Sequence, residues 1–409
     1  MSLLDEGVVA IADAFRTGAS LCPLVEECLD RAEADPHHAF LHVDRDGALV
    51  QAEALEAARA EGKTLGTLAG VPVAIKDNLC VRDLPATCAS KVLEGWIAPY
   101  DAHVIERLRE AGAILVGKTN LDEFAMGSST EHSAYGPTTH PRDSSRSPGG
   151  SSGGSAVAVA GGAVPASLGS DTGGSVRQPA AFCGVVALKP TYGRVSRYGL
   201  VAFASSLDVV GPFGRSVRDA ARILEAIAAP DPRDATCAAR PVDEYEDACA
   251  QTIRGKVVGV PRVLLEGADE GVRASFEDAL TRLKDAGATI VDVDLPHASV
   301  AVSVYYLVAP AEASSNLSRY DGVRFGARGS EASLAELYET TRAKFGDEVK
   351  RRIMLGTYAL SAGYYDEYYG KATKVRSLIR GDYEAAFEQC DVVATPTAPT
   401  TAFPLGSRT

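Results

Sequence analysis

Residues 147–175 read SPGGSSGGSAVAVAGGAVPASLGSDTGGS and consist mostly of Gly, Ser, Ala and Val. A flexible Gly/Ser linker would not carry the apolar runs AVAVA and AVPASL within it. Because small side chains let backbones approach closely, we expect a buried helix at Ser155–Ala160 and a core strand at Val164–Leu168. The two clusters rich in glycine and serine then lie at the ends of core elements.

Helices and strands alternate on both sides of this stretch. Upstream, the run Val71–Ile75 predicts a buried strand that ends at Lys76, and an amphipathic helix at Ala102–Ala111 precedes a strand at Ala113–Val116. Downstream, a strand, a helix and a strand are predicted at Lys256–Val260, Gly271–Ala286 and Thr289–Val293. This alternation predicts an α/β fold with a large mixed β-sheet core, flanked by helices on both faces.

The first 60 residues show helical periodicity throughout. We therefore expect an N-terminal helical segment, residues 1–65, packed on one large domain, residues 66–409.

Composition excludes several classes of protein. The 409 residues are 46% hydrophobic and 23% charged, which fits a folded chain with a sizeable core. The net charge of −13 argues against a broad nucleic-acid-binding surface, so a partner would have to hold any nucleic acid. Eight cysteines without a CxxC pair indicate free thiols and a cytoplasmic location, and no apolar run reaches the roughly 18 residues of a membrane span.

Two motif matches fail on their context. GAILVGKT at 112–119 fits the nucleotide-binding pattern GxxxxGK[ST], but a strand occupies its middle positions and cannot curl around a phosphate. GSSGG at 150–154 fits the GxSxG nucleophile turn, but the preceding PRDSSRSPG cannot form the strand that this turn requires. The sequence has no HExxH motif and no Cys/His cluster, so it does not predict a zinc site. The spacing of its histidines neither excludes nor favours a Ser-His-Asp triad.

A lysine at a strand end and two serines in glycine-rich turns remain as candidates. A serine hydroxyl needs a base to become a nucleophile, and Lys76 can serve if burial keeps it uncharged near pH 7. Backbone N–H groups around Ser175 could stabilise an oxyanion, each by about 3–4 kcal/mol. Each residue taken alone could instead only shape a turn or carry a surface charge.

Three strings taken together resemble the amidase signature family: AIKDN at 74–78, GGSSGGSA at 149–156 and GSDTGGSVRQPA at 169–180. The resemblance implies the amidase signature fold, with Ser175 as the acylated nucleophile, Ser151 as the bridging serine and Lys76 as the terminal base. It also implies a cis peptide bond between Gly150 and Ser151. The oxyanion hole would come from the backbone of Thr172, Gly173, Gly174 and Ser175.

Strings at 121–138, 189–212, 312–326 and 351–372 are similar to the branch of this family that hydrolyses glutamine for tRNA-dependent amidotransferases. That branch implies a heterotrimer with partners known as the B and C subunits, in which ammonia reaches the B subunit. The B subunit would use ATP and Mg to amidate Glu-tRNA(Gln), Asp-tRNA(Asn) or both, and would make the main contacts with the misacylated tRNA. This chain itself is expected to bind no cofactor or metal.

Glutamine recognition requires a partner for its α-carboxylate, and an arginine fork suits that group. The resemblance implies that Arg352 binds the carboxylate and that Tyr305 lies in the same pocket; Arg352 could instead be a solvated helix charge beside Arg351. The family continues for some tens of residues beyond the string at 395–406, so we expect its C-terminal part to be missing here. Two rivals remain: a stand-alone amidase for another amide, and a non-catalytic homologue that only binds.

Overall fold

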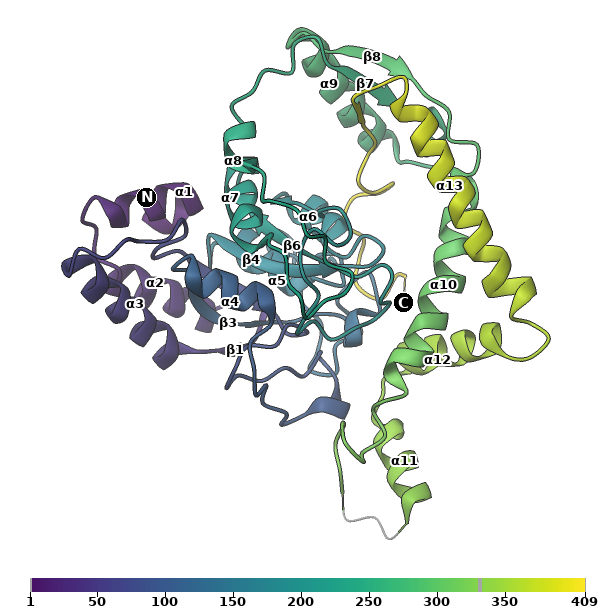
Figure 1. Ribbon diagram of the computed structural model, residues 1–409, viewed down its shortest axis with the longest axis horizontal. Coiled ribbons are helices and arrows are strands. Elements are labelled where there is room, and N and C mark those ends of the chain that lie inside the picture. The colour runs from purple at the N-terminus through teal and green to yellow at the C-terminus, as the bar shows by residue number, and fades with distance from the viewer. Residues whose placement is uncertain (1, 330–332, 409) are drawn as a thin grey trace. The chain divides into compact units, whose positions relative to one another are not determined.

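The computed structural model describes residues 2–329 and 333–408, and the chain forms two compact units (Figure 1). The first unit contains residues 1–249, 316–350 and 404–409, and the second contains residues 250–315 and 351–403. Within the described part of the chain, no helix is both long and apolar enough to cross a membrane.

A six-stranded mixed sheet forms the centre of the first unit, in the order β1-β3-β2-β4-β6-β5. The strands are β1 (Phe40–Val43), β2 (Pro72–Lys76), β3 (Ile114–Thr119), β4 (Ala166–Asp171), β5 (Val186–Ala187) and β6 (Val209–Gly214). β2 runs parallel to both β3 and β4, and the other pairs are antiparallel. Every residue of β2, β3, β4 and β6 is buried, as expected of strands covered on both faces.

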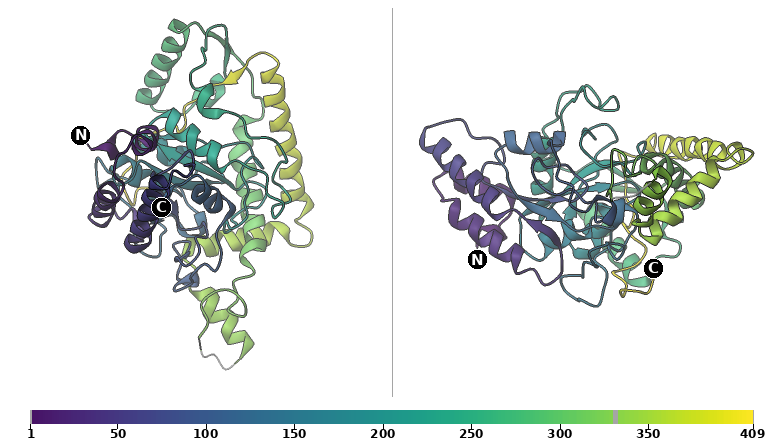
Figure 2. Two further views of the ribbon diagram at one scale, coloured as in Figure 1. Left: turned by 60° about the vertical axis from the view of Figure 1, so that its left-hand side comes forward. Right: turned by 90° about the horizontal axis from the view of Figure 1, so that it is seen from below.

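Helices flank this sheet, as the alternating pattern predicted. The helices of the first unit are α1 (Val8–Arg16), α2 (Cys22–Glu33), α3 (Arg45–Ala60), α4 (His103–Glu110), α5 (Gly153–Ala160), α6 (Arg177–Cys183), α7 (Val217–Ile227), α8 (Tyr245–Ala248) and α11 (Leu334–Ala343), of which α11 is not packed on the sheet. The purple helices α1 to α3 lie together in each view (Figure 2). The apolar string AVAVA forms α5, which packs on β4 and β2, so the Gly/Ser-rich stretch is part of the core.

The second unit is built on a three-stranded parallel sheet in the order β8-β7-β9. Its strands are β7 (Val257–Val260), β8 (Thr289–Asp292) and β9 (Val392–Val393), and its helices are α9 (Glu270–Asp285) and α13 (Lys371–Phe387) together with most of α10 (Ala301–Leu317) and α12 (Asp347–Leu360). The predicted strand, helix and strand downstream of residue 255 correspond to β7, α9 and β8. Short 3₁₀ turns lie at Leu3–Asp5, Lys91–Leu93, Glu123–Ala125, Arg262–Leu265 and Ala298–Val300, and a π-helical turn at Asp366–Gly370.

The organisation into units differs from the expected boundary at residue 65. The N-terminal residues are not only helical, because they supply β1, whose residues pair with β3 in the central sheet. They therefore belong to the first unit. Residues 66–409 in turn are shared between the two units, because residues 250–315 and 351–403 cluster around a sheet of their own.

Candidate active site

Lys76 is the last residue of β2, the strand between β3 and β4, and its side chain is fully buried. Its Nζ lies 2.7 Å from Ser151 Oγ, 2.8 Å from Ser152 Oγ and 3.0 Å from Ser170 Oγ. Asn78 Nδ2 donates a hydrogen bond to Ser170 Oγ at 2.9 Å. The Ser170 carbonyl lies 3.3 Å from the same nitrogen, and among the described residues no carboxylate lies within ion-pair distance of Lys76.

Burial has a direct consequence for the charge of this amine. Loss of hydration lowers the pKa of Lys76 to about 7, although the buried carboxyl groups of Asp122, Asp171 and Asp208 act in the opposite direction. Near neutral pH a large fraction of Lys76 is therefore uncharged. An uncharged Nζ has a lone pair that can accept the proton of the Ser151 hydroxyl.

Ser151 lies just before α5, and the peptide bond between Gly150 and Ser151 is cis, as the resemblance implied. The Asp122 N–H donates to the Ser151 carbonyl at 3.2 Å. The carboxylate of Asp122 accepts N–H bonds from Ser129, Thr130 and His132. A Cβ on Gly150 would lie 2.2 Å from Asp122 Oδ2, so only glycine fits at this position.

The loop between β4 and α6 holds Ser175. Asp171, at the end of β4, accepts the N–H groups of Gly174 and Val176 at 2.8 and 3.0 Å and the guanidinium fork of Arg177. Burial raises the pKa of Asp171, but these bonds and the charge of Arg177 outweigh it and the net pKa is lowered. The carboxylate therefore stays ionised and shapes the loop.

The two serine loops are joined through their backbones. The Ser152 N–H donates to the Ser175 carbonyl at 3.1 Å, and Ser175 is 7% exposed. In the described chain, no hydrogen bond joins the hydroxyl groups of Ser151 and Ser175. The structure thus brings the Lys76 amine into contact with the Ser151 hydroxyl. The hydrogen bond that would carry a proton from Ser175 to Ser151 is not formed.

The backbone amides of residues 172–175 are not equivalent. The Gly174 N–H is already donated to Asp171, and Gly174 has φ +127°, a conformation that strains other residues. The N–H groups of Gly173 and Ser175 have no acceptor in the described parts of the chain. The Thr172 N–H likewise has no acceptor among the described residues, so Thr172, Gly173 and Ser175 offer available donors and only the Gly174 N–H is engaged.

Asp208, which was not predicted from the sequence, binds the same loop. It accepts a hydrogen bond from Thr172 Oγ1 at 2.6 Å and from the N–H groups of Phe203 and Ala204. Burial raises its pKa to about 6. Ser152 and Ser170 were also missed, although both lie within the quoted glycine-rich strings, because such residues usually only form turns.

Tyr305 and Arg352 belong to the second unit, on α10 and α12. Arg352 is 6% exposed, which argues against a solvated helix charge, and its guanidinium lies 5.7 Å from the ring centroid of Tyr306. The rings of Tyr305 and Tyr306 meet edge to face at 5.5 Å. Their part in glutamine binding stays a prediction.

Comparison with known proteins identifies the family. The model of the family described as Amidase matches residues 23–409. The chain belongs to the amidase family. This amidase is 57% identical, over 93% of its own length and 79% of the relative, to the A subunit of the glutamyl-tRNA(Gln) amidotransferase of Moorella thermoacetica.

Solved structures agree with this assignment. The crystal structure of the glutamyl-tRNA(Gln) amidotransferase A subunit from Thermotoga maritima is 43% identical to the amidase, covers 99% of it and 81% of that chain, and has a TM-score of 0.77. The native peptide amidase of Stenotrophomonas maltophilia is 31% identical, covers 97% of this amidase and 86% of that chain, and has a TM-score of 0.80. Both share the mixed sheet flanked by helices.

Proposed function

We propose that this amidase is the glutamine-hydrolysing component of a tRNA-dependent amidotransferase. The observation that carries the proposal is the identity of 57–58% to glutamyl-tRNA(Gln) amidotransferase A subunits over 93–94% of the chain. The buried amine beside a serine hydroxyl supports it chemically, because amide hydrolysis needs an activated nucleophile at neutral pH.

In the proposed reaction, uncharged Lys76 accepts the Ser151 proton while Ser151 accepts that of Ser175. The Ser175 Oγ forms a bond to the carboxamide carbon, and the N–H groups of Gly173 and Ser175 donate to the oxyanion. The carbon–nitrogen bond then breaks, and the proton returns along the same path to the departing ammonia. Water hydrolyses the resulting ester and releases glutamate.

The remaining groups serve recognition and transfer. Arg352 binds the α-carboxylate of glutamine with Tyr305 beside it, since a bidentate guanidinium matches that group. Ammonia passes to the B subunit, which uses ATP and Mg to activate the acid on the misacylated tRNA, and the C subunit binds both larger chains. A net charge of −13 is compatible with tRNA contacts made mainly by the B subunit in a cytoplasmic heterotrimer.

The test uses the chain assembled with the B and C subunits. Lys76→Ala and Ser175→Ala should each abolish amidation of Glu-tRNA(Gln) with glutamine as the nitrogen donor, while amidation with added ammonium chloride continues. Loss of both activities would contradict the proposed division of labour. Retention of glutamine-dependent amidation in either variant would contradict the assigned roles.

A stand-alone amidase is the second candidate. The likeness to the peptide amidase of Stenotrophomonas maltophilia favours it, because that enzyme shares 31% of its residues over nearly the whole of this chain. The two candidates differ in their need for partners. Hydrolysis of C-terminal peptide amides by the isolated chain, at a rate above that of glutamine hydrolysis in the complex, would favour the stand-alone amidase.

A further inference from the structure

Lys118, the lysine of the GAILVGKT string, is part of the core and not of a nucleotide-binding loop. Residues Ile114–Thr119 form β3, so Lys118 projects from a core strand. Its side chain is fully buried, and its Nζ lies 2.9 Å from Asp77 Oδ1. The same ammonium donates to the carbonyl groups of Leu79 at 2.9 Å and Pro85 at 2.7 Å.

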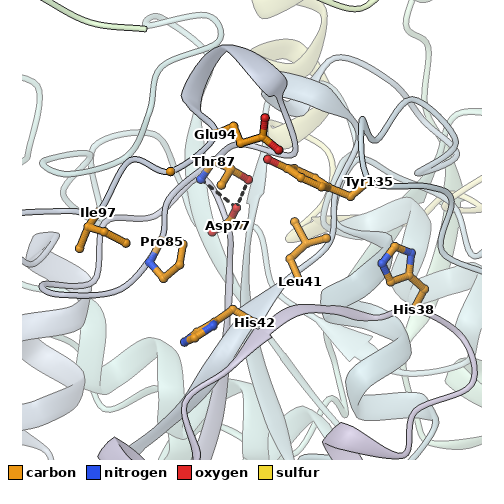
Figure 3. Close-up of a pocket in the computed structure, with 10 residues that line it drawn as sticks. His38, Leu41, His42, Asp77, Pro85, Thr87, Glu94, Ile97 and Tyr135 are labelled. Atoms are coloured by element: carbon orange, nitrogen blue, oxygen red, sulfur yellow. Dashed lines mark hydrogen bonds between the residues drawn. The ribbon is translucent and has the colours of Figure 1, made fainter. Parts of the chain in front are cut away.

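Asp77, the partner of Lys118, directly follows Lys76 and is 1% exposed. Its Oδ2 accepts both the N–H and the hydroxyl of Thr87, and its carbonyl accepts the Cys88 N–H at 3.1 Å. Figure 3 shows Asp77 and Thr87 joined by these bonds in the wall of an open pocket of about 420 Å³. Asp77 and Lys118 together thus bind the loop from residue 77 to residue 88 at four places, namely Leu79, Pro85, Thr87 and Cys88.

Sheet hydrogen bonding does not hold this part of the chain by itself. The pairing of β2 with β4 ends at Ile75, and the last bond to β3 runs from the Asp77 N–H to the Thr119 carbonyl. Lys118 pairs with Ile75 in the parallel register of β2 and β3, and Ile75 and Lys76 are consecutive in β2, so the side chains of Lys118 and Lys76 lie on opposite faces of the sheet. The ion pair thus fixes the chain on the side away from Ser151.

We propose that Asp77 and Lys118 are positioning residues that hold the end of β2 in place, so that the Lys76 amine stays within hydrogen-bond distance of Ser151. The pair touches neither Ser151 nor Ser175 and acts only through Lys76. A displacement of about 1 Å at a reacting group can cost roughly a hundredfold in rate. This inference rests on the proposed role of Lys76 as the base.

The decisive variant is the double substitution Asp77→Asn with Lys118→Met in the assembled complex. Replacing both members of a buried pair avoids an uncompensated charge and is often neutral for stability, unlike either single change. Because Lys118→Met also leaves the Leu79 and Pro85 carbonyls without their lysine donor, we expect a lowered thermal midpoint. In the folded variant we expect kcat for glutamine hydrolysis lowered about tenfold to a hundredfold and KM unchanged. A purely structural pair would leave kcat unaltered once the protein folds.

A matched control changes an ion pair elsewhere in the first unit. Arg222 and Glu246 join α7 to α8 through bonds that involve none of the residues around Lys76. Arg222→Met with Glu246→Gln should therefore leave kcat and KM as they are.

The outcomes separate this inference from the proposed function. Absence of glutamine hydrolysis in the wild-type complex would contradict the proposed function. Wild-type kcat in the folded Asp77→Asn, Lys118→Met variant would overturn only the positioning role. If that variant does not fold, Thr87→Val removes the hydroxyl bond to Asp77, together with the bond that the same oxygen accepts from the Ala89 N–H. A lowered kcat at unchanged KM supports the inference, and an unchanged kcat overturns it.

Discussion

The charge of Lys76 should control the rate of Ser175 acylation across the physiological pH range. With a pKa of about 7, roughly 90% of Lys76 is uncharged at pH 8 and only about 1% at pH 5. Because only the uncharged amine accepts a proton, acylation should fall nearly a hundredfold between these pH values. The loss should approach tenfold per pH unit below pH 6.

The assay is single-turnover glutamine hydrolysis by the assembled complex, with ammonia release followed from pH 5 to pH 9. Asp208 also titrates in this range, since its pKa is about 6, so the profile is repeated with Asp208→Asn. A limb with its midpoint near pH 7 in the wild type that persists in this variant belongs to Lys76, and it should shift to lower pH because the Asp208 charge no longer raises the pKa of Lys76. A profile that is flat from pH 5.5 to pH 8, or a limb that disappears with Asp208→Asn, would refute the reasoning.

Three further substitutions test the surroundings of the site. Burial raises the pKa of Asp208, so ionisation of this carboxyl group destabilises the fold as the pH rises. The free energy of unfolding of Asp208→Asn, measured by chemical denaturation, should match that of the wild type near pH 4 and exceed it by about 3 kcal/mol above pH 6. Gly150→Ala should lower the thermal midpoint or abolish folding, because its Cβ would overlap Asp122. Arg352→Met should raise KM for glutamine at least tenfold and leave ammonia-dependent amidation intact; an unchanged KM would remove Arg352 from the substrate site.

Much of the fold followed from local patterns. The apolar run AVAVA, at helical length between glycine clusters, gave the expected helix, now α5. The β-branched run before Lys76 gave β2. In both cases burial depends on side chains that are neighbours in sequence, which is the information that periodicity contains.

Two features of the fold could not be predicted from such local patterns. β1 is four residues long and has a mixed apolar and polar sequence, FLHV, so its identity depends on pairing with β3 rather than on its own composition. The second unit is assembled from residues 250–315 and 351–403, which are separated along the chain.

The site shows the same limit. Lys76, Ser151 and Ser175 could be singled out as candidates because each lies in a distinctive string, and the structure places Lys76 beside Ser151, while their catalytic roles stay a proposal. Asp208 could not, because it reaches Thr172 only through the fold, 36 residues away in sequence. The engagement of the Gly174 N–H by Asp171 likewise depends on the loop's three-dimensional course.

The central claim is that Ser175 becomes a nucleophile through Ser151 and an uncharged Lys76. Its most direct test is the rate at which a glutamine-analogue electrophile modifies the wild-type complex, Lys76→Met and Ser151→Ala at pH 8, with the modified residue located by peptide mass spectrometry. The account predicts modification of Ser175 in the wild type and rates at least a hundredfold lower in both variants. Modification at another residue, or wild-type rates in Lys76→Met, would contradict it.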